Sequence, residues 1–165
     1  MKKLFLIRHA KSSWKDPGLH DLDRPLNGRG RRQLDLMREL IHANGAFDGP
    51  VFCSTAMRAR LTLAGLLGNR SPDVAHFDEA LYTFDDDDLL EWLDDREEDQ
   101  LTLIGHNPAL EDLADRLLKP GPGHLPTCAF VGMVIPVMSW QNIEQAKARL
   151  LVFATPKRVA ADAGL

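Results

Sequence analysis

Leu-Phe-Leu-Ile-Arg-His-Ala, residues 4–10, is the stretch that decides the fold of this chain. Its four apolar residues in a row predict a strand buried on both faces, as in a parallel sheet. The strand ends abruptly at two basic side chains, Arg8 and His9. Because ligands of open α/β sheets bind just beyond the carboxyl ends of the strands, this pair lies where a functional site is expected. Taken alone, the stretch fits an exposed basic turn equally well.

Length and composition predict one globular domain. The chain has 165 residues, of which 44% are hydrophobic and 27% are charged, an ordinary balance for a folded protein. Its net charge of −4 argues against a general nucleic-acid binder, because phosphate backbones require a basic surface. Two cysteines suit a reducing compartment, and no apolar stretch approaches the length of a membrane span or a signal peptide. We therefore expect a cytoplasmic protein that contacts neither membrane nor nucleic acid.

Predicted strands and helices alternate along the rest of the chain. Apolar runs predict strands at 51–53, 74–77, 101–104, 129–137 and 149–154. Helical spacing predicts helices at 28–44, 57–67 and 109–118, and a further helix with an acid-rich start at 85–88. Asn27 is the expected N-cap of the first helix and Gly45 its stop signal.

This alternation predicts a single-domain α/β fold, a three-layer sandwich with a mostly parallel central sheet and helices on both faces. The direction of the last two strands stays open, and antiparallel is one option. We assign residues 1–157 to this domain and expect a frayed tail over 158–165. The long polar loop 10–27 is of the kind that usually carries function.

Three of the predicted strands deliver polar residues just past their carboxyl ends. The first delivers Arg8 and His9, the second delivers Ser54 and one helical turn later Arg58, and the fourth delivers His106. In a parallel sheet these ends open on one edge, so the two arginines and two histidines can share a pocket. Clustered cations need an anion among them, and a phosphoryl group suits forked arginine donors best.

These residues also carry a resemblance to a known family. Leu-Ile-Arg-His-Ala at 6–10, Asp-Arg-Pro-Leu-Asn at 23–27, Arg58-Ala59 with Thr62 downstream, and Ile-Gly-His-Asn-Pro at 104–108 resemble the histidine phosphatase (phosphoglycerate-mutase-like) superfamily, and most of all its small SixA-type phosphohistidine phosphatase branch. The likeness extends from residue 3 to about residue 157. It implies that His9 is the phosphorylated nucleophile, that Arg8 and Arg58 clamp the phosphate, and that His106 is the second pocket histidine. The superfamily more often has Gly where this chain has Ala10, a change that is harmless unless the backbone needs a Gly-only conformation.

The chemistry of the four residues is consistent with that implication. His9 needs one unprotonated ring nitrogen for attack, so its other N–H should donate to a carbonyl. Arg8 and Arg58 would hold the phosphoryl oxygens, and a protonated His106 would add a donor. Since positioning and electrostatics suffice for phosphoryl transfer, we expect no metal and no cofactor.

Two further residues are weaker candidates for substrate binding. Arg24 could touch the substrate, or could simply pair with Asp21 or Asp23. Glu79 could act as a general acid, or could be a structural carboxylate near the arginines. In larger members of the superfamily the acid lies a little further on, at a place where this chain has Thr83, which cannot donate a proton in that way.

Other reactive side chains have simpler explanations. Cys53 precedes Arg58 as the nucleophile of a cysteine phosphatase precedes its arginine, but four residues intervene instead of five and none is Gly. The acids at 85–88 lack the alternating pattern of a calcium loop, and a solvated helix start explains them better. His20, His42, His76 and His124 have no metal-ligand spacing.

We therefore predict a metal-independent phosphatase that acts through a phosphohistidine on His9. The expected partner is a phosphorylated protein, dephosphorylated at phosphohistidine, or a small phosphorylated metabolite. Two alternatives remain open: a small-molecule phosphomonoesterase of the same superfamily, and a non-catalytic domain that binds phosphorylated ligands. The sequence does not define the oligomeric state, and we expect a monomer.

Overall fold

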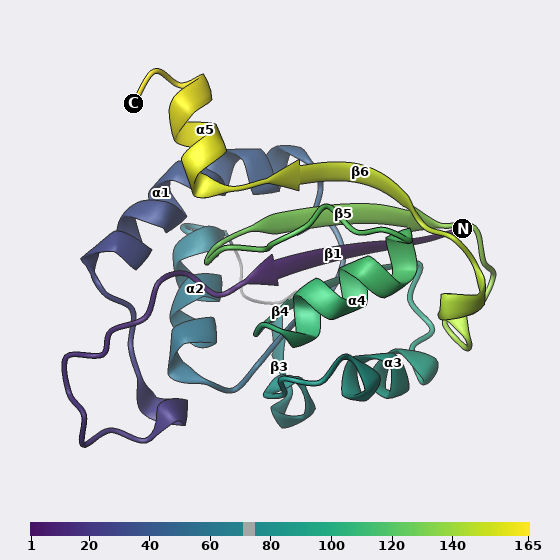
Figure 1. Cartoon of the computed structure of the whole chain (residues 1–165), viewed down its shortest axis with the longest axis horizontal. Coiled ribbons are helices and arrows are strands. Elements are labelled where there is room, and N and C mark those ends of the chain that lie inside the picture. Colours follow the sequence, from purple (N-terminus) through teal and green to yellow (C-terminus); the bar gives the residue numbers. More distant parts are fainter. Residues whose placement is uncertain (71–74) are drawn as a thin grey trace.

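The computed structural model describes residues 1–70 and 75–165, and its central feature is a six-stranded sheet (Figure 1). The strands are β1 (Lys2–Arg8), β2 (Val51–Cys53), β3 (Ala75–Phe77), β4 (Gln100–Gly105), β5 (Phe130–Ile135) and β6 (Arg149–Ala154), in the order β3-β2-β4-β1-β5-β6. The first four run parallel, whereas β5 and β6 pair antiparallel. The predicted third strand corresponds to β3, and Val74 lies outside the described residues.

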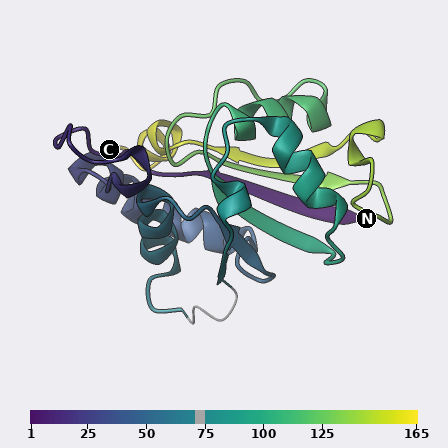
Figure 2. The same ribbon diagram turned by 90° about the horizontal axis from the view of Figure 1, so that it is seen from below.

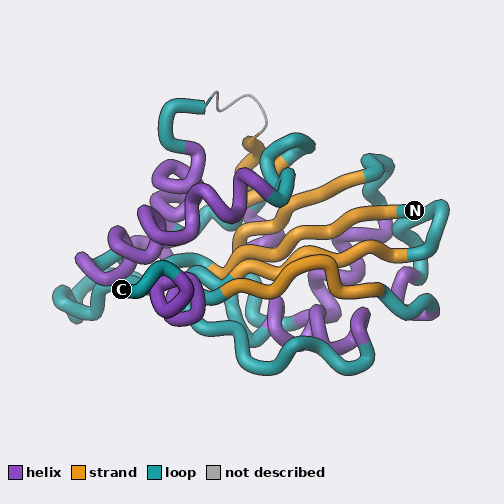
Figure 3. The backbone as a smooth tube through the Cα atoms, turned by 90° about the horizontal axis from the view of Figure 1, so that it is seen from above, coloured by secondary structure: helices purple, strands orange, loops and turns teal. Residues whose placement is uncertain are grey.

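Both faces of the sheet are covered, as the unbroken apolar run of β1 predicts. Leu4 and Leu6 pack into a core formed with α3 (Asp86–Asp94) and α4 (Ala109–Leu118). Phe5 and Ile7 pack into a second core formed with α1 (Gly28–Ala43) and α2 (Met57–Leu67). Figures 2 and 3 show the sheet between these two pairs of helices. The predicted three-layer α/β sandwich is confirmed.

Local signals account for the first helix. The side chain of Asn27 accepts a hydrogen bond from the Gly30 N–H at 2.9 Å, which caps α1 as predicted. The helix ends at Ala43, and Gly45 then adopts φ of 81°, a left-handed conformation that favours glycine. Gly30 also fixes the loop 10–27, because a Cβ there would lie 2.2 Å from the Lys11 carbonyl oxygen. The helix start and the loop are therefore locked together.

The end of the chain differs from the expectation of a frayed tail. Residues Pro156–Asp162 form α5, which lies beside α1 (Figure 1). Thr155 caps this helix by accepting from the Arg158 N–H at 3.3 Å, and Pro156 occupies its first turn, where a missing N–H costs nothing. A domain boundary near residue 157 remains a prediction. Among the described residues, no helix combines the length and the apolar character needed to cross a bilayer.

Candidate active site

Strand register explains why distant residues meet at one edge of the sheet. Arg8 of β1 pairs with Gly105 of β4, and Cys53 of β2 pairs with Ile104 of the same strand. His9 and His106, which follow β1 and β4, are therefore level with each other, and Ser54, which follows β2, lies one residue behind them. The ring centroids of His9 and His106 lie 5.3 Å apart. The predicted convergence of strand ends is present in the structure.

His9 is held with one ring nitrogen free. Its Nδ1 lies 2.7 Å from the carbonyl oxygen of Ala10, and because a carbonyl only accepts, Nδ1 carries the hydrogen. Burial, followed by the charges of Arg58 and Arg8, lowers the pKa of His9 to about 3. The imidazole is therefore neutral near pH 7, with its lone pair on Nε2. This is the tautomer that nucleophilic attack requires.

The alanine in place of the superfamily's usual glycine is accommodated without strain. The φ angle of Ala10 is not positive, so its backbone does not need the left-handed conformation that favours glycine. Its N–H donates to the Thr62 hydroxyl at 2.9 Å, and that hydroxyl donates to the Arg58 carbonyl oxygen at 2.7 Å. The backbone after His9 is thus tied to the helix that carries Arg58.

His106 differs from the expectation that it is protonated. Its Nε2 lies 2.7 Å from the hydroxyl of Ser54, and that oxygen accepts from the Ala56 N–H at 3.2 Å. Among the described residues the hydroxyl has no other acceptor, so it donates to Nε2 and the ring proton resides on Nδ1. The buried Nδ1 of His106 has no hydrogen-bond partner among the described residues. Burial, and then proximity to His9, lowers the pKa of His106 to about 3, so the ring is a neutral donor.

The two arginines keep donors available. Arg58 is almost fully buried, and its Nη1 and Nη2 donate to the backbone oxygen and to Oδ2 of Asp21 at 2.7 and 2.9 Å. Arg8 donates from Nη1 to the Leu125 carbonyl oxygen at 2.9 Å, and its buried Nε has no partner among the described residues. Since each guanidinium has five N–H groups, several remain for an anion.

Asp21 is a site residue that the sequence reasoning did not find. Besides Arg58, its carboxylate accepts from Arg24 Nη1 at 2.8 Å and from the Tyr82 hydroxyl at 2.6 Å. Arg24 thus pairs with Asp21 and not with Asp23. Burial opposes ionisation, but hydrogen bonds from Tyr82 and Arg58 prevail and hold the pKa of the Asp21 carboxyl well below its usual range. The only sequence signal was its position in the long loop 10–27.

The other candidates lie apart from this cluster. Glu79 is exposed in the turn η3 (Glu79–Leu81) and has no hydrogen bond to the four predicted residues. It lines an acidic groove with Asp88 and Glu91. Thr83 donates to Asp88 at 2.6 Å and so supports the start of α3. Burial raises the pKa of the Cys53 thiol to about 12, which leaves no thiolate to act as a nucleophile near pH 7.

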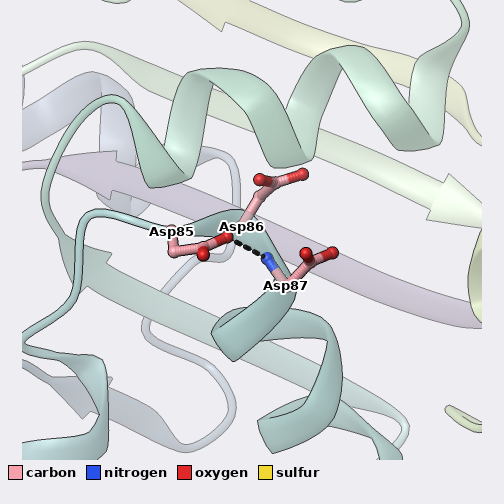
Figure 4. A group of neighbouring side chains, drawn as sticks. All are labelled: Asp85, Asp86 and Asp87. Atoms are coloured by element: carbon pink, nitrogen blue, oxygen red, sulfur yellow. Dashed lines mark hydrogen bonds between the residues drawn. The ribbon is translucent and has the colours of Figure 1, made fainter.

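The acids before α3 are engaged in structural interactions. Asp85, Asp86 and Asp87 lie close enough to offer three carboxylate oxygens together (Figure 4). However, Asp85 caps the helix by accepting from the Asp87 N–H at 2.9 Å. Asp86 and Asp87 both accept from Arg116, at 3.0 and 2.6 Å. The helix cap and one arginine account for these carboxylates.

Comparisons with known proteins find a matching family and similar folds. Residues 4–89 match the histidine phosphatase superfamily (branch 1). An uncharacterised protein of Mycobacterium tuberculosis is 32% identical over 162 residues, which cover 92% of this chain and all of that protein. The fold is similar to a candidate phosphohistidine phosphatase SixA from Nakamurella multipartitia, with a TM-score of 0.77 and 23% identity over 94% and 96% of the two chains. It is also similar to the protein histidine phosphatase SixA complexed with tungstate, with a TM-score of 0.76 and 19% identity over 95% and 99%.

Proposed function

Because the chain belongs to the histidine phosphatase superfamily, we propose that it is a phosphatase whose nucleophile is His9. Nε2 of His9 attacks phosphorus in line with the leaving group, and water then hydrolyses the resulting phosphohistidine. One observation carries this proposal: the Nδ1–H of His9 is bound by the Ala10 carbonyl, so a neutral ring offers Nε2 beside two arginines.

The neighbouring donors stabilise the transferring phosphoryl group. Arg8 and Arg58 supply N–H groups for its oxygens, and the Nδ1–H of His106 supplies another while Ser54 fixes that tautomer. These donors are buried and held before the reaction, so they need little reorganisation as charge moves in the transition state. A structure of similar fold, the protein histidine phosphatase SixA, is complexed with tungstate, an oxyanion, and this supports an anionic ligand in our proposal.

The same donors make a metal unnecessary in this proposal. Two guanidinium groups and an imidazole N–H perform the charge clamping that metal ions perform in other phosphatases. We expect EDTA to leave the rate unchanged. A loss of activity in EDTA that magnesium or zinc restores would contradict this part of the proposal.

We keep the cytoplasm as the expected location, since both cysteines are free and buried.

Phosphohistidine on a protein is the substrate we favour. An alkyl phosphate ester leaves as a poor alkoxide and depends on a positioned acid. Glu79 is outside the cluster, Thr83 cannot donate, and Asp21 is ionised, so none of these three side chains suits that task. A phosphorylated imidazole leaves without a strong acid once its ring is protonated. Structures of similar fold named phosphohistidine phosphatase support this choice.

The test is a ranking of substrates by leaving group. We expect kcat/KM to be highest for a phosphohistidine peptide, lower for an aryl phosphate and lowest for an alkyl phosphate, and to be unchanged in Glu79→Gln. If alkyl esters match phosphohistidine and Glu79→Gln selectively destroys ester cleavage, the phosphomonoesterase alternative is correct. Binding of phosphorylated ligands without turnover of any substrate would instead indicate a non-catalytic domain.

A further inference from the structure

We propose that Asp21 recognises the leaving group, by accepting a hydrogen bond from the far ring nitrogen of the phosphorylated imidazole. This inference rests on the proposed function and adds a residue that selects phosphorus–nitrogen over phosphorus–oxygen substrates. Its basis is the location of a carboxylate between the buried phosphate-binding arginine and solvent.

Asp21 lies on the solvent side of the cluster. It belongs to the turn η1 (Asp21–Asp23) in the loop 10–27, and its side chain is 43% exposed, whereas that of Arg58 beneath it is 4% exposed. Arg58 bonds to Asp21 with only two of its five N–H groups. A phosphoryl group held by the remaining N–H groups would therefore have Asp21 as a neighbour on the side from which the substrate enters.

The carboxylate is ionised and can only accept. Three groups face it: Arg24 from its own loop, Arg58 from α2, and the Tyr82 hydroxyl that follows η3, and all three donate to it. His106, after β4, is near enough for the charge of Asp21 to affect its pKa, and it is neutral. Asp21 is therefore not a general acid, but a fixed negative charge on the solvent side of the cluster.

Such a charge favours the departure of a phosphorylated imidazole. When His9 Nε2 forms its bond to phosphorus, the P–N bond breaks and its electron pair stays on the ring nitrogen. If the far ring nitrogen carries a proton, the ring leaves as neutral imidazole, whereas without that proton it must leave as an anion. A carboxylate that accepts from the far N–H stabilises the protonated, cationic ring of the bound substrate.

Aromatic side chains beside Asp21 suit a planar leaving group. The ring of Tyr82 lies 5.4 Å from that of His106, and the ring of Phe84 lies 5.5 Å from it. Phe84 is 48% exposed, so one part of this wall is open to a ligand. A planar cationic ring can pack against such a surface while its N–H points to the carboxylate.

For an oxygen leaving group the same carboxylate has the opposite effect. An aryl phosphate leaves as a phenolate, whose developing negative charge the Asp21 carboxylate repels. Asp21 should therefore help one class of substrate and hinder the other. A residue that only positions Arg58 would affect both classes alike, which makes the two roles separable.

The experiment compares Asp21→Asn with Asp23→Asn, a matched change in the same turn. The substrates are 1-phosphoimidazole, a phosphohistidine peptide and an aryl phosphate. In Asp21→Asn we expect kcat/KM for both P–N substrates to fall about tenfold or more relative to kcat/KM for the aryl phosphate, the scale of a hydrogen bond to a charged group. Asp23→Asn should leave kcat/KM unchanged for all three substrates. An equal fall for all substrates would overturn the inference.

The wild type provides a second measurement that does not depend on how Asp21→Asn folds. The pH profile of kcat reports groups in the enzyme–substrate complex. For 1-phosphoimidazole its alkaline limb should lie at higher pH than the titration of the free compound, because Asp21 favours the protonated ring. A limb at the pH of the free compound would contradict the inference. If the wild type turns over none of the substrates, it is the proposed function that fails.

Discussion

Two arginine–carboxylate clusters in this chain have opposite balances of charge. In the surface cluster, Arg116 of α4 bonds to three carboxylates, those of Asp86, Asp87 and Glu144, at 2.6 to 3.0 Å. In the site cluster, Arg24 and Arg58 share the single carboxylate of Asp21. Arg8 adds a third cation near Arg58, and Glu111 adds a second carboxylate near Arg8. The site therefore keeps an excess of positive charge, whereas the surface cluster has an excess of negative charge.

Because the two clusters differ in burial, their excess charges have different energetic consequences. The surface cluster is partly exposed, so water screens its charges and the ion pairs contribute little. In the site cluster the arginine side chains are largely withdrawn from water, where an uncompensated charge is costly. An anion that completes the site cluster removes that cost. The buried excess of arginine charge thus supports the proposed phosphate site, and an exposed excess of carboxylates does not by itself indicate a metal site.

The largest expected effect comes from removing His9, the proposed nucleophile of the site. In His9→Ala we expect kcat/KM for an aryl phosphate to fall on the order of a millionfold, the scale observed when an enzyme loses its nucleophile. The fold should remain, because His9 follows β1 and lies outside the apolar cores. Steady-state kinetics measure the loss, and a circular dichroism melt like that of the wild type is the control. Substantial activity in a folded His9→Ala would place the nucleophile elsewhere.

The next largest effect is expected when the site cluster loses one of its arginines. In Arg58→Ala we expect a loss on the order of a hundredfold or more in kcat, comparable to the loss of one preorganised oxyanion donor. The measurement is single-turnover kinetics with saturating enzyme, so that weaker substrate binding does not hide the effect on chemistry. An Arg58→Ala variant that loses only affinity, with kcat intact, would mean that Arg58 binds the ground state and the transition state equally.

Acid should destabilise the fold through the site histidines. Both have a pKa of about 3 in the folded chain, mainly because of burial, against an ordinary value near 6.5. Between these values the unfolded chain binds more protons than the folded one, so the free energy of unfolding falls as pH falls. Each histidine can lower the free energy of unfolding by at most about 1.4 kcal/mol per pH unit. Urea unfolding at pH 7.5 and pH 5 measures this fall in the free energy of unfolding. The fall should be smaller in His9→Ala than in the wild type. Equal falls in the two proteins would contradict burial of His9 as a cause.

The smallest effect is expected in the surface cluster. Arg116→Ala should leave kcat/KM within about twofold and change the free energy of unfolding only slightly, as for exposed ion pairs. Urea unfolding and steady-state kinetics check both values. A loss of activity similar to that of Arg58→Ala would mean that α3 and α4 transmit strain to the site, and the contrast between the two clusters would disappear.

Local patterns in the sequence predicted much of the fold. The predicted bounds of α2 and α4 agree with the structure, because periodic apolar residues and a preceding turn define both helices. The unbroken apolar run of β1 predicted burial on both faces, which two separate cores confirm. The end of the chain was mispredicted because α5 depends on a single cap at Thr155, a weak signal in an otherwise polar segment.

The site was predictable as far as strand order allowed. Arg8 ends β1, His9 and His106 directly follow strands that the sequence predicted to be parallel, and Arg58 lies in the first turn of the helix after β2. Asp21 and Tyr82 lie 61 positions apart and meet only because a loop and a turn fold over the same edge. The neutral state of His106 was unpredictable for a related reason, since the burial that lowers its pKa depends on tertiary packing.

The most direct test of the central claim is to trap the covalent intermediate. Wild-type protein is mixed for milliseconds with ³²P-labelled phosphohistidine peptide, denatured in alkali, digested and mapped by mass spectrometry. The account predicts one labelled peptide, with phosphate on His9, that is stable in alkali and released in acid, and no label in His9→Ala. Label that persists in His9→Ala, or that lies on another residue, would contradict the assignment of His9 as the nucleophile.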